Sequence, residues 1–133
     1  MMDDKRTSYI DLYGKRYPLC LTVSAQERIT QTFGGLGKMA AAMDENGEVA
    51  VGALADLMHI LMCGGRDRAA ALAWMAGEEA EAAPQIPECA ILKGLLTLED
   101  IKQYQGQLFE AIRLSSGQEV EVDPEKGKNA ETT

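Results

Sequence analysis

The sequence predicts a mainly α-helical fold: a compact bundle of about five helices, with a short N-terminal β-hairpin and a disordered acidic C-terminal tail. Composition favours helices, because apolar residues make up 46% of the 133 residues while aromatic residues make up only 5%. The core must therefore consist mainly of Leu, Ile, Val, Met and Ala, and Leu, Met and Ala are good helix formers. Apolar residues also recur at steps of three and four residues. The length fits one domain.

Two short alternating runs, residues 9–13 and 17–21, predict the hairpin. Residues 14–16 separate the two runs and include Gly14, so we expect the turn there. Pro18 cannot donate a hydrogen bond to a neighbouring strand, and the second strand should therefore lie at a sheet edge. The residues before the hairpin, 1–8, are expected to be flexible.

The first helix should begin at Ser24, because Ser24 and Glu27 form the S-x-x-E pattern of a capping box. Gly34-Gly35 should end it. A short second helix is expected from Leu36 up to the turn signal Asn46-Gly47.

Residues 48–63 predict the central helix, because apolar side chains cover more than half of its circumference. We expect Gly64-Gly65 to end this helix. A separate helix should then begin at Asp67 and run to about Glu79.

Two prolines within residues 82–87 predict a loop, and residues 90–96 predict a short apolar helix. Thr97 and Asp100 should open a last helix that Gly117 ends. Residues 118–133 are mostly polar or charged and should be disordered. The predicted organisation is a flexible N-terminus (1–8), a single helical domain with the hairpin (9–117) and the tail (118–133).

Charge and hydropathy exclude two classes of partner. The chain has 13 Lys and Arg against 21 Asp and Glu, a net charge of -8, which repels phosphate backbones. The longest apolar stretch, residues 49–63, is interrupted by Asp56 and His59, and residues 1–6 contain no apolar run. We therefore expect no binding to nucleic acid and no membrane segment.

The sequence contains no recognisable arrangement of catalytic residues. The three cysteines are widely spaced, which is typical of a reducing compartment. His59 and Cys63 are four residues apart and would share a helix face, but no second pair stands at ligand spacing. We expect a structural histidine, no metal, no cofactor and no enzymatic activity; a small enzyme or metal-dependent regulator built around His59 and Cys63 is the competing interpretation.

The methionines suggest a binding surface. Met39 and Met43 are four residues apart, as are Met58 and Met62, so each pair would share a helix face. One interpretation is that all four are ordinary core residues. The other is that they line an apolar groove for a segment of another protein, because Met adapts to irregular apolar shapes. The hypothesised partner-binding residues are therefore Met39, Met43, Met58 and Met62.

The hairpin sequence Tyr-Gly-Lys-Arg-Tyr-Pro-Leu, residues 13–19, is followed by Leu-Thr-Val-Ser-Ala at 21–25 and a helix ending in Phe33-Gly34. This order, extending over residues 9–116, resembles the small tail assembly chaperones of long-tailed phages and prophages of Gram-positive bacteria. The resemblance implies a mainly helical, non-catalytic protein of the host bacterial cytoplasm. It would bind the tape measure protein, help recruit tail tube subunits and be absent from the finished tail.

Chaperones that coat a filament often self-associate weakly, so the resemblance also allows self-association of this chain. The alternative within phage assembly is a structural head-to-tail connector or a minor tail protein, which would remain in the particle.

Overall fold

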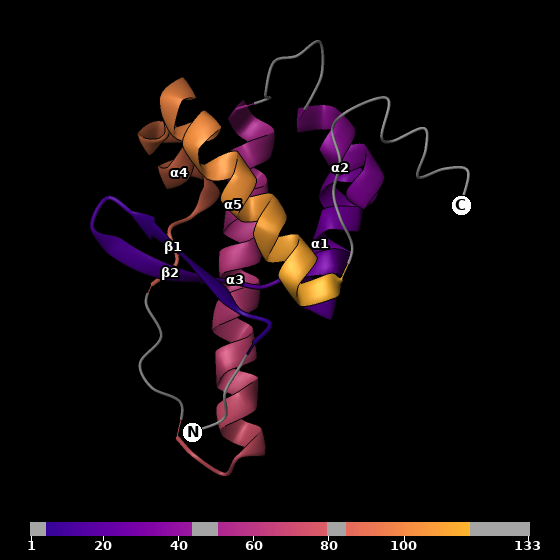
Figure 1. Ribbon diagram of the computed structural model, residues 1–133, viewed down its shortest axis with the longest axis vertical. Helices are drawn as coiled ribbons and strands as arrows, with labels where there is room; N and C mark the ends of the chain where they lie inside the picture. The colour runs from indigo at the N-terminus through magenta and orange to yellow at the C-terminus, as the bar shows by residue number, and fades with distance from the viewer. Residues whose placement is uncertain (1–4, 44–50, 80–84, 118–133) are drawn as a thin grey trace.

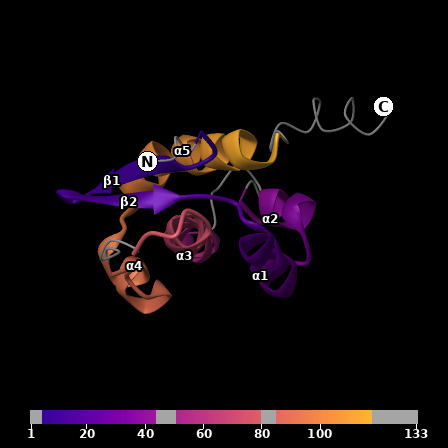
Figure 2. The same cartoon turned by 90° about the horizontal axis from the view of Figure 1, so that it is seen from below.

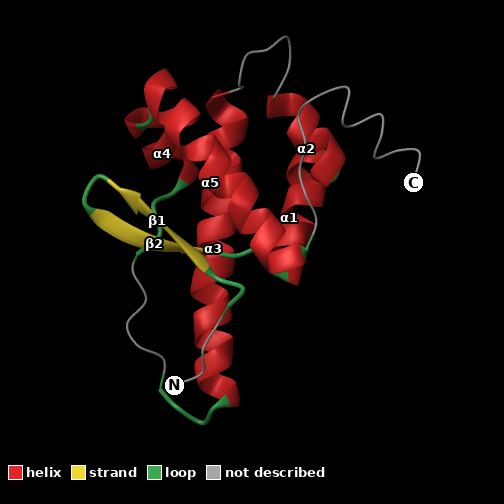
Figure 3. Cartoon of the chain, in the orientation of Figure 1, coloured by secondary structure: helices red, strands yellow, loops and turns green. Residues whose placement is uncertain are grey.

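The computed structural model describes residues 5–43, 51–79 and 85–117 (Figure 1). These residues form, in order, β1 (Ser8–Leu12), β2 (Lys15–Leu19), α1 (Val23–Phe33), α2 (Leu36–Met43), α3 (Val51–Met75), α4 (Cys89–Leu95) and α5 (Leu98–Ser116). The predicted mainly α fold with an N-terminal hairpin is thus confirmed, and Figure 3 shows the two strands beside an otherwise helical chain. The predicted disordered tail, the first four residues of the predicted flexible N-terminus and the Asn46-Gly47 turn lie outside the described residues.

Helix α3 lies at the centre and contacts β2 and all four other helices. Seen nearly along its axis, α3 has the hairpin and α5 on one side, α1 and α2 on a second and α4 on a third (Figure 2). This arrangement explains why the sequence of α3 is apolar over most of its circumference: its first two-thirds has neighbours on several sides.

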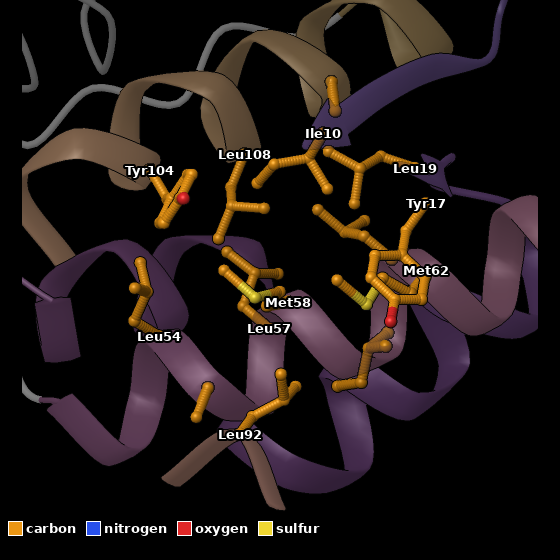
Figure 4. Packing of buried hydrophobic residues seen from close by; sticks show 14 of the residues in the cluster. Ile10, Tyr17, Leu19, Leu54, Leu57, Met58, Met62, Leu92, Tyr104 and Leu108 are labelled. Carbon is orange, nitrogen blue, oxygen red and sulfur yellow. The ribbon is translucent and has the colours of Figure 1, made fainter. Parts of the chain in front are cut away.

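All seven elements contribute to one core (Figure 4). Among the described residues no polar or charged residue is buried. The largest fully buried side chains are Ile10, Leu19, Ile29, Met39, Leu54, Leu57, Met58, Leu61, Met62, Leu92 and Ile101. A single core shared by every element is what a one-domain protein requires.

The hairpin turn is shorter than expected. β1 and β2 pair antiparallel from Ser8↔Leu19 to Leu12↔Lys15, which leaves Tyr13-Gly14 as a two-residue turn. Both turn residues have positive φ, 49° and 85°, as a type I′ turn requires. The predicted turn at residues 14–16 was therefore wrong, because a two-residue turn of this type matches the twist of the strands and begins one residue earlier.

Helix α1 begins at a different cap from the one predicted. The Thr22 hydroxyl accepts a hydrogen bond from the Ala25 amide at 3.1 Å, so Thr22 is the N-cap and Ser24 lies inside the helix. The end of α1 is confirmed: Gly34 takes the left-handed conformation at φ 95°. The capping box of Thr97 and Asp100 and the stop at Gly117 are also confirmed.

The predicted break at Gly64-Gly65 does not occur, because α3 continues through both glycines to Met75. A Cβ atom on Gly64 would lie 2.2 Å from the Cys20 carbonyl oxygen, and one on Gly65 would lie 2.6 Å from Pro18 Cβ. These glycines therefore allow the end of β2 to cross α3 in close contact. The Cys20 amide donates to the Leu61 carbonyl at 3.0 Å at this crossing.

The helix predicted to begin at Asp67 is thus the last part of α3. It ends at Met75, and Gly77 just beyond it has φ 72°. The Gly77 amide donates to the Trp74 carbonyl and the Glu78 amide to the Ala73 carbonyl, at 3.1 and 2.9 Å. This pair of hydrogen bonds is a Schellman motif.

The turn of the hairpin is tied to the start of α5. The Tyr13 hydroxyl donates to Asp100 Oδ2 at 2.7 Å, and the Thr97 amide donates to the same oxygen at 3.0 Å. Both bonds lower the pKa of the Asp100 carboxyl, the Thr97 amide contributing most. Hydrogen bonds to a carboxylate stabilise its charged form.

This tie predicts a dependence of stability on pH. A carboxyl whose pKa is lower in the folded state stabilises the fold above its unfolded pKa, which is about 3.9 for Asp, and that contribution is lost as the pH falls through the folded pKa. We expect the gap in free energy of unfolding between the wild type and Asp100→Asn to be constant near neutral pH and to shrink below about pH 4. Urea unfolding at several pH values measures this gap. A gap that stays the same down to pH 2 would contradict the role of the carboxylate.

Candidate functional site

His59 is held by the protein on both ring nitrogens. Its Nδ1 lies 2.8 Å from the Pro87 carbonyl oxygen, which can only accept, so Nδ1 carries the proton. In the neutral ring Nε2 then accepts, and its partner is the Cys63 thiol at 3.5 Å. The ring thus fastens the segment before α4 to the middle of α3, as a structural histidine would.

A second polar group lies between α3 and α4. Lys93 Nζ is 3.4 Å from Asp56 Oδ1. Burial, together with a hydrogen bond to Asp56, raises the pKa of the Cys89 thiol. A raised pKa keeps the thiol protonated at neutral pH, and the protonated form is a poor nucleophile and a poor metal ligand.

Within residues 5–43, 51–79 and 85–117, no three His, Cys, Asp or Glu side chains come together in a way that could hold a metal ion. Structural zinc sites use four protein ligands and catalytic zinc sites usually use three. His59 and Cys63 therefore gain no third ligand from the described part of the chain.

Three of the four methionines proposed as a partner-binding face are core residues. Met39, Met58 and Met62 are fully buried. Figure 4 shows Met58 beneath Leu108 and Met62 beside the ring of Tyr17, each enclosed by apolar side chains. The folded chain does not present these three side chains to a partner, which corrects the expectation of an exposed groove. The side chain of Met43 lies outside the described residues.

Large apolar side chains reach the surface elsewhere. The last ten residues of α3, Arg66–Met75, are here called the α3 arm. It extends beyond the hairpin and away from α4 (Figure 1). Near its end, Trp74 and Met75 are 78% and 71% exposed. The sequence does not predict the exposure of Trp74 and Met75, because no local pattern of residues distinguishes a helix that projects from the fold from one that is covered.

Three more large apolar side chains are exposed where α4 is followed by α5: Ile91, Leu95 and Leu98, here called the α4–α5 patch. Ile91 and Leu95 are one helical turn apart on α4, and Leu98 is the first residue of α5. They are 58%, 37% and 66% exposed. Leu92 and Leu96 are buried and attach this region to the core, so the three exposed residues are not needed for that attachment.

The hairpin also exposes two aromatic side chains, Tyr9 and Tyr13, but each already contacts a charged side chain. The Arg16 guanidinium lies 4.3 Å from the centre of the Tyr9 ring, a cation–π contact. Tyr13 is engaged by Asp100 through its hydroxyl. The exposed apolar side chains of the α3 arm and of the α4–α5 patch are therefore the candidate contact residues.

No described helix combines the length and hydropathy that crossing a membrane would need. Comparisons of the chain with models of protein families, with curated proteins and with solved structures returned no match.

Proposed function

We propose that this protein is a non-catalytic tail assembly chaperone of a phage or prophage, which acts in the host bacterial cytoplasm. It binds the tape measure protein and helps to recruit tail tube subunits. The sequence resemblance supports this function, and the α4–α5 patch is the observation that carries the proposed mode of binding. Large apolar side chains that remain exposed beside a complete core mark sites of protein interaction.

The patch suits a helical partner. Ile91 and Leu95 lie one turn apart on α4 and are both exposed, so an apolar helix could pack along them. A tape measure protein is long, helical and apolar. The net charge of -8 would keep a complex between the two proteins soluble.

Each such contact is weak. Burying the exposed area of three aliphatic side chains contributes on the order of 3–5 kcal/mol, whereas association itself costs about 4–15 kcal/mol. A single patch would therefore bind only transiently. Many copies along one tape measure protein would bind firmly, because linked weak contacts reinforce one another.

The test is co-expression with the tape measure and tail tube proteins encoded by neighbouring genes. We expect the wild-type chain to purify with the tape measure protein and Ile91→Glu together with Leu95→Glu to lower the amount bound at least about tenfold. Both side chains are exposed, so the variant should keep the helical circular dichroism of the wild type.

The matched control is Val23→Glu. Val23 is 79% exposed at the start of α1, where an acidic residue suits the helix dipole. Binding by this variant should equal that of the wild type. If the α4 double variant still bound normally, the patch would not be the contact surface. If the wild type bound neither protein, the chaperone function would be wrong, and its detection in purified virions would identify a connector or minor tail protein instead.

A further inference from the structure

The α3 arm contributes no side chain to the core. The last side chain that α3 buries in the core is that of Cys63, and every residue of the arm is exposed or half-buried. The arm extends beyond the hairpin, away from the rest of the helices (Figure 1). It can therefore lose its helical structure without opening a cavity in the core.

The crossing of β2 over α3 marks the boundary of such a change. Gly64 and Gly65 are buried there, and the hydrogen bond from the Cys20 amide to the Leu61 carbonyl fixes the helix just before the arm. Before this crossing, α3 is held by packing against β2 and the other helices. After it, the helix depends mainly on its own backbone hydrogen bonds.

Local signals keep the arm helical. Four of its ten residues are alanine, the best helix former, and the Schellman motif at Gly77 satisfies carbonyl groups at its end. Because the arm continues an existing helix, it needs no new nucleus. Each good helix former added to a helix is favoured by a factor of about 1 to 1.6, so ten of them give about 100 at most.

The core is held much more firmly than that. Small folded domains outnumber their unfolded state by a factor of about 10³ to 10⁸. Opening of the arm therefore occurs more often than unfolding of the core, and the two are separate events.

We propose that the α3 arm is an order–disorder switch: residues 66–75 unfold and refold as a unit while the core, including α3 up to Gly65, stays folded. Opening releases Trp74 and Met75 from fixed positions relative to the core. A molecule that binds only the helical arm holds it closed, and one that binds only the extended segment holds it open. This inference does not rest on the proposed function, because it uses neither the α4–α5 patch nor the tape measure protein.

Hydrogen exchange of the wild-type chain, followed by NMR, tests the proposal. The amides of residues 70–76 report the arm, and the Cys20 amide reports the crossing. The arm amides should exchange at least about tenfold faster than the Cys20 amide. Low concentrations of urea should accelerate them little, because opening the arm exposes little surface.

Two outcomes of this measurement would overturn the proposal. If the arm amides and the Cys20 amide exchanged at the same rate with the same urea dependence, the arm would open only with the core. If fast exchange were confined to the amides after Leu72, only the end of the helix would fray, and the arm would not open as a unit.

Two glycine variants separate opening of the arm from unfolding of the core. Ala70 in the arm and Gln107 in α5 are both exposed helical residues, and glycine at either position should disfavour its helix about three- to fivefold. Gln107→Gly should accelerate exchange of the Cys20 amide by this factor and leave the arm amides unchanged, because α5 stays folded when the arm opens.

Ala70→Gly should accelerate both sets of amides, because the arm is also unfolded when the whole chain unfolds. If Gln107→Gly accelerated the arm amides as strongly as the Cys20 amide, the arm and the core would open together and the proposal would be wrong. Circular dichroism of both variants should match that of the wild type, since each substitution is at an exposed position.

Discussion

Gly64→Ala is expected to lower the free energy of unfolding by roughly 3–5 kcal/mol, or to prevent stable folding altogether. The new Cβ would lie 2.2 Å from the Cys20 carbonyl oxygen, a backbone atom that cannot rotate away. β2 and the chain after it would have to move off α3, and the hydrogen bond from the Cys20 amide to Leu61 would lengthen or break. Urea unfolding followed by circular dichroism measures the loss.

The matched control is Gly106→Ala. Gly106 lies within α5, and a Cβ there would meet nothing within 4 Å. Because Ala favours helix over Gly, this variant should be more stable than the wild type by up to about 1 kcal/mol. A Gly64→Ala protein as stable as the wild type would mean that β2 does not cross α3 at this point.

The path of the chain at Gly64-Gly65 could not be predicted from the sequence. A Gly-Gly pair after an apolar helix commonly ends it, and the local sequence contains nothing that distinguishes an end from a close crossing. The deciding contacts are with Pro18 and Cys20, which are distant in sequence. The helix-forming, Ala-rich run after Asp67 was the available sign that the helix continues.

Several signals that act within a few residues were predicted correctly. The capping box of Thr97 and Asp100 and the stops at Gly34 and Gly117 depend only on neighbouring backbone groups. The start of α1 offered two hydroxyl residues, Thr22 and Ser24. A contact distant in sequence favours Thr22 as the cap. The Leu21 amide donates to the Ser115 hydroxyl of α5 at 2.9 Å, and this hydrogen bond fixes the chain just before the helix.

The candidate binding surfaces were the least predictable part. Spacing assigns two residues to one helix face, but it does not say whether that face points inward. Ile91 and Leu92 are equally apolar neighbours on α4, yet one is exposed and the other fully buried. A surface is what the assembled elements leave uncovered, so the α3 arm and the α4–α5 patch follow only from the arrangement of the whole chain.

Met58→Ala and Met62→Ala are each expected to lower the free energy of unfolding by about 2–5 kcal/mol, because each leaves a cavity in the core. Met75→Ala removes the same side chain where it is 71% exposed, and it should change the stability of the monomer by less than about 0.5 kcal/mol. Urea unfolding of the three variants at one low protein concentration compares them directly.

This contrast also decides how a loss of partner binding should be interpreted. Because Met58 and Met62 are fully buried, Met58→Glu together with Met62→Glu would place two carboxylates in the core and should unfold the chain. Lost binding by that variant would therefore report lost structure. A Met58→Ala protein that kept wild-type stability and lost the tape measure protein would show the opposite: an accessible methionine face, and a core packed differently from the one described.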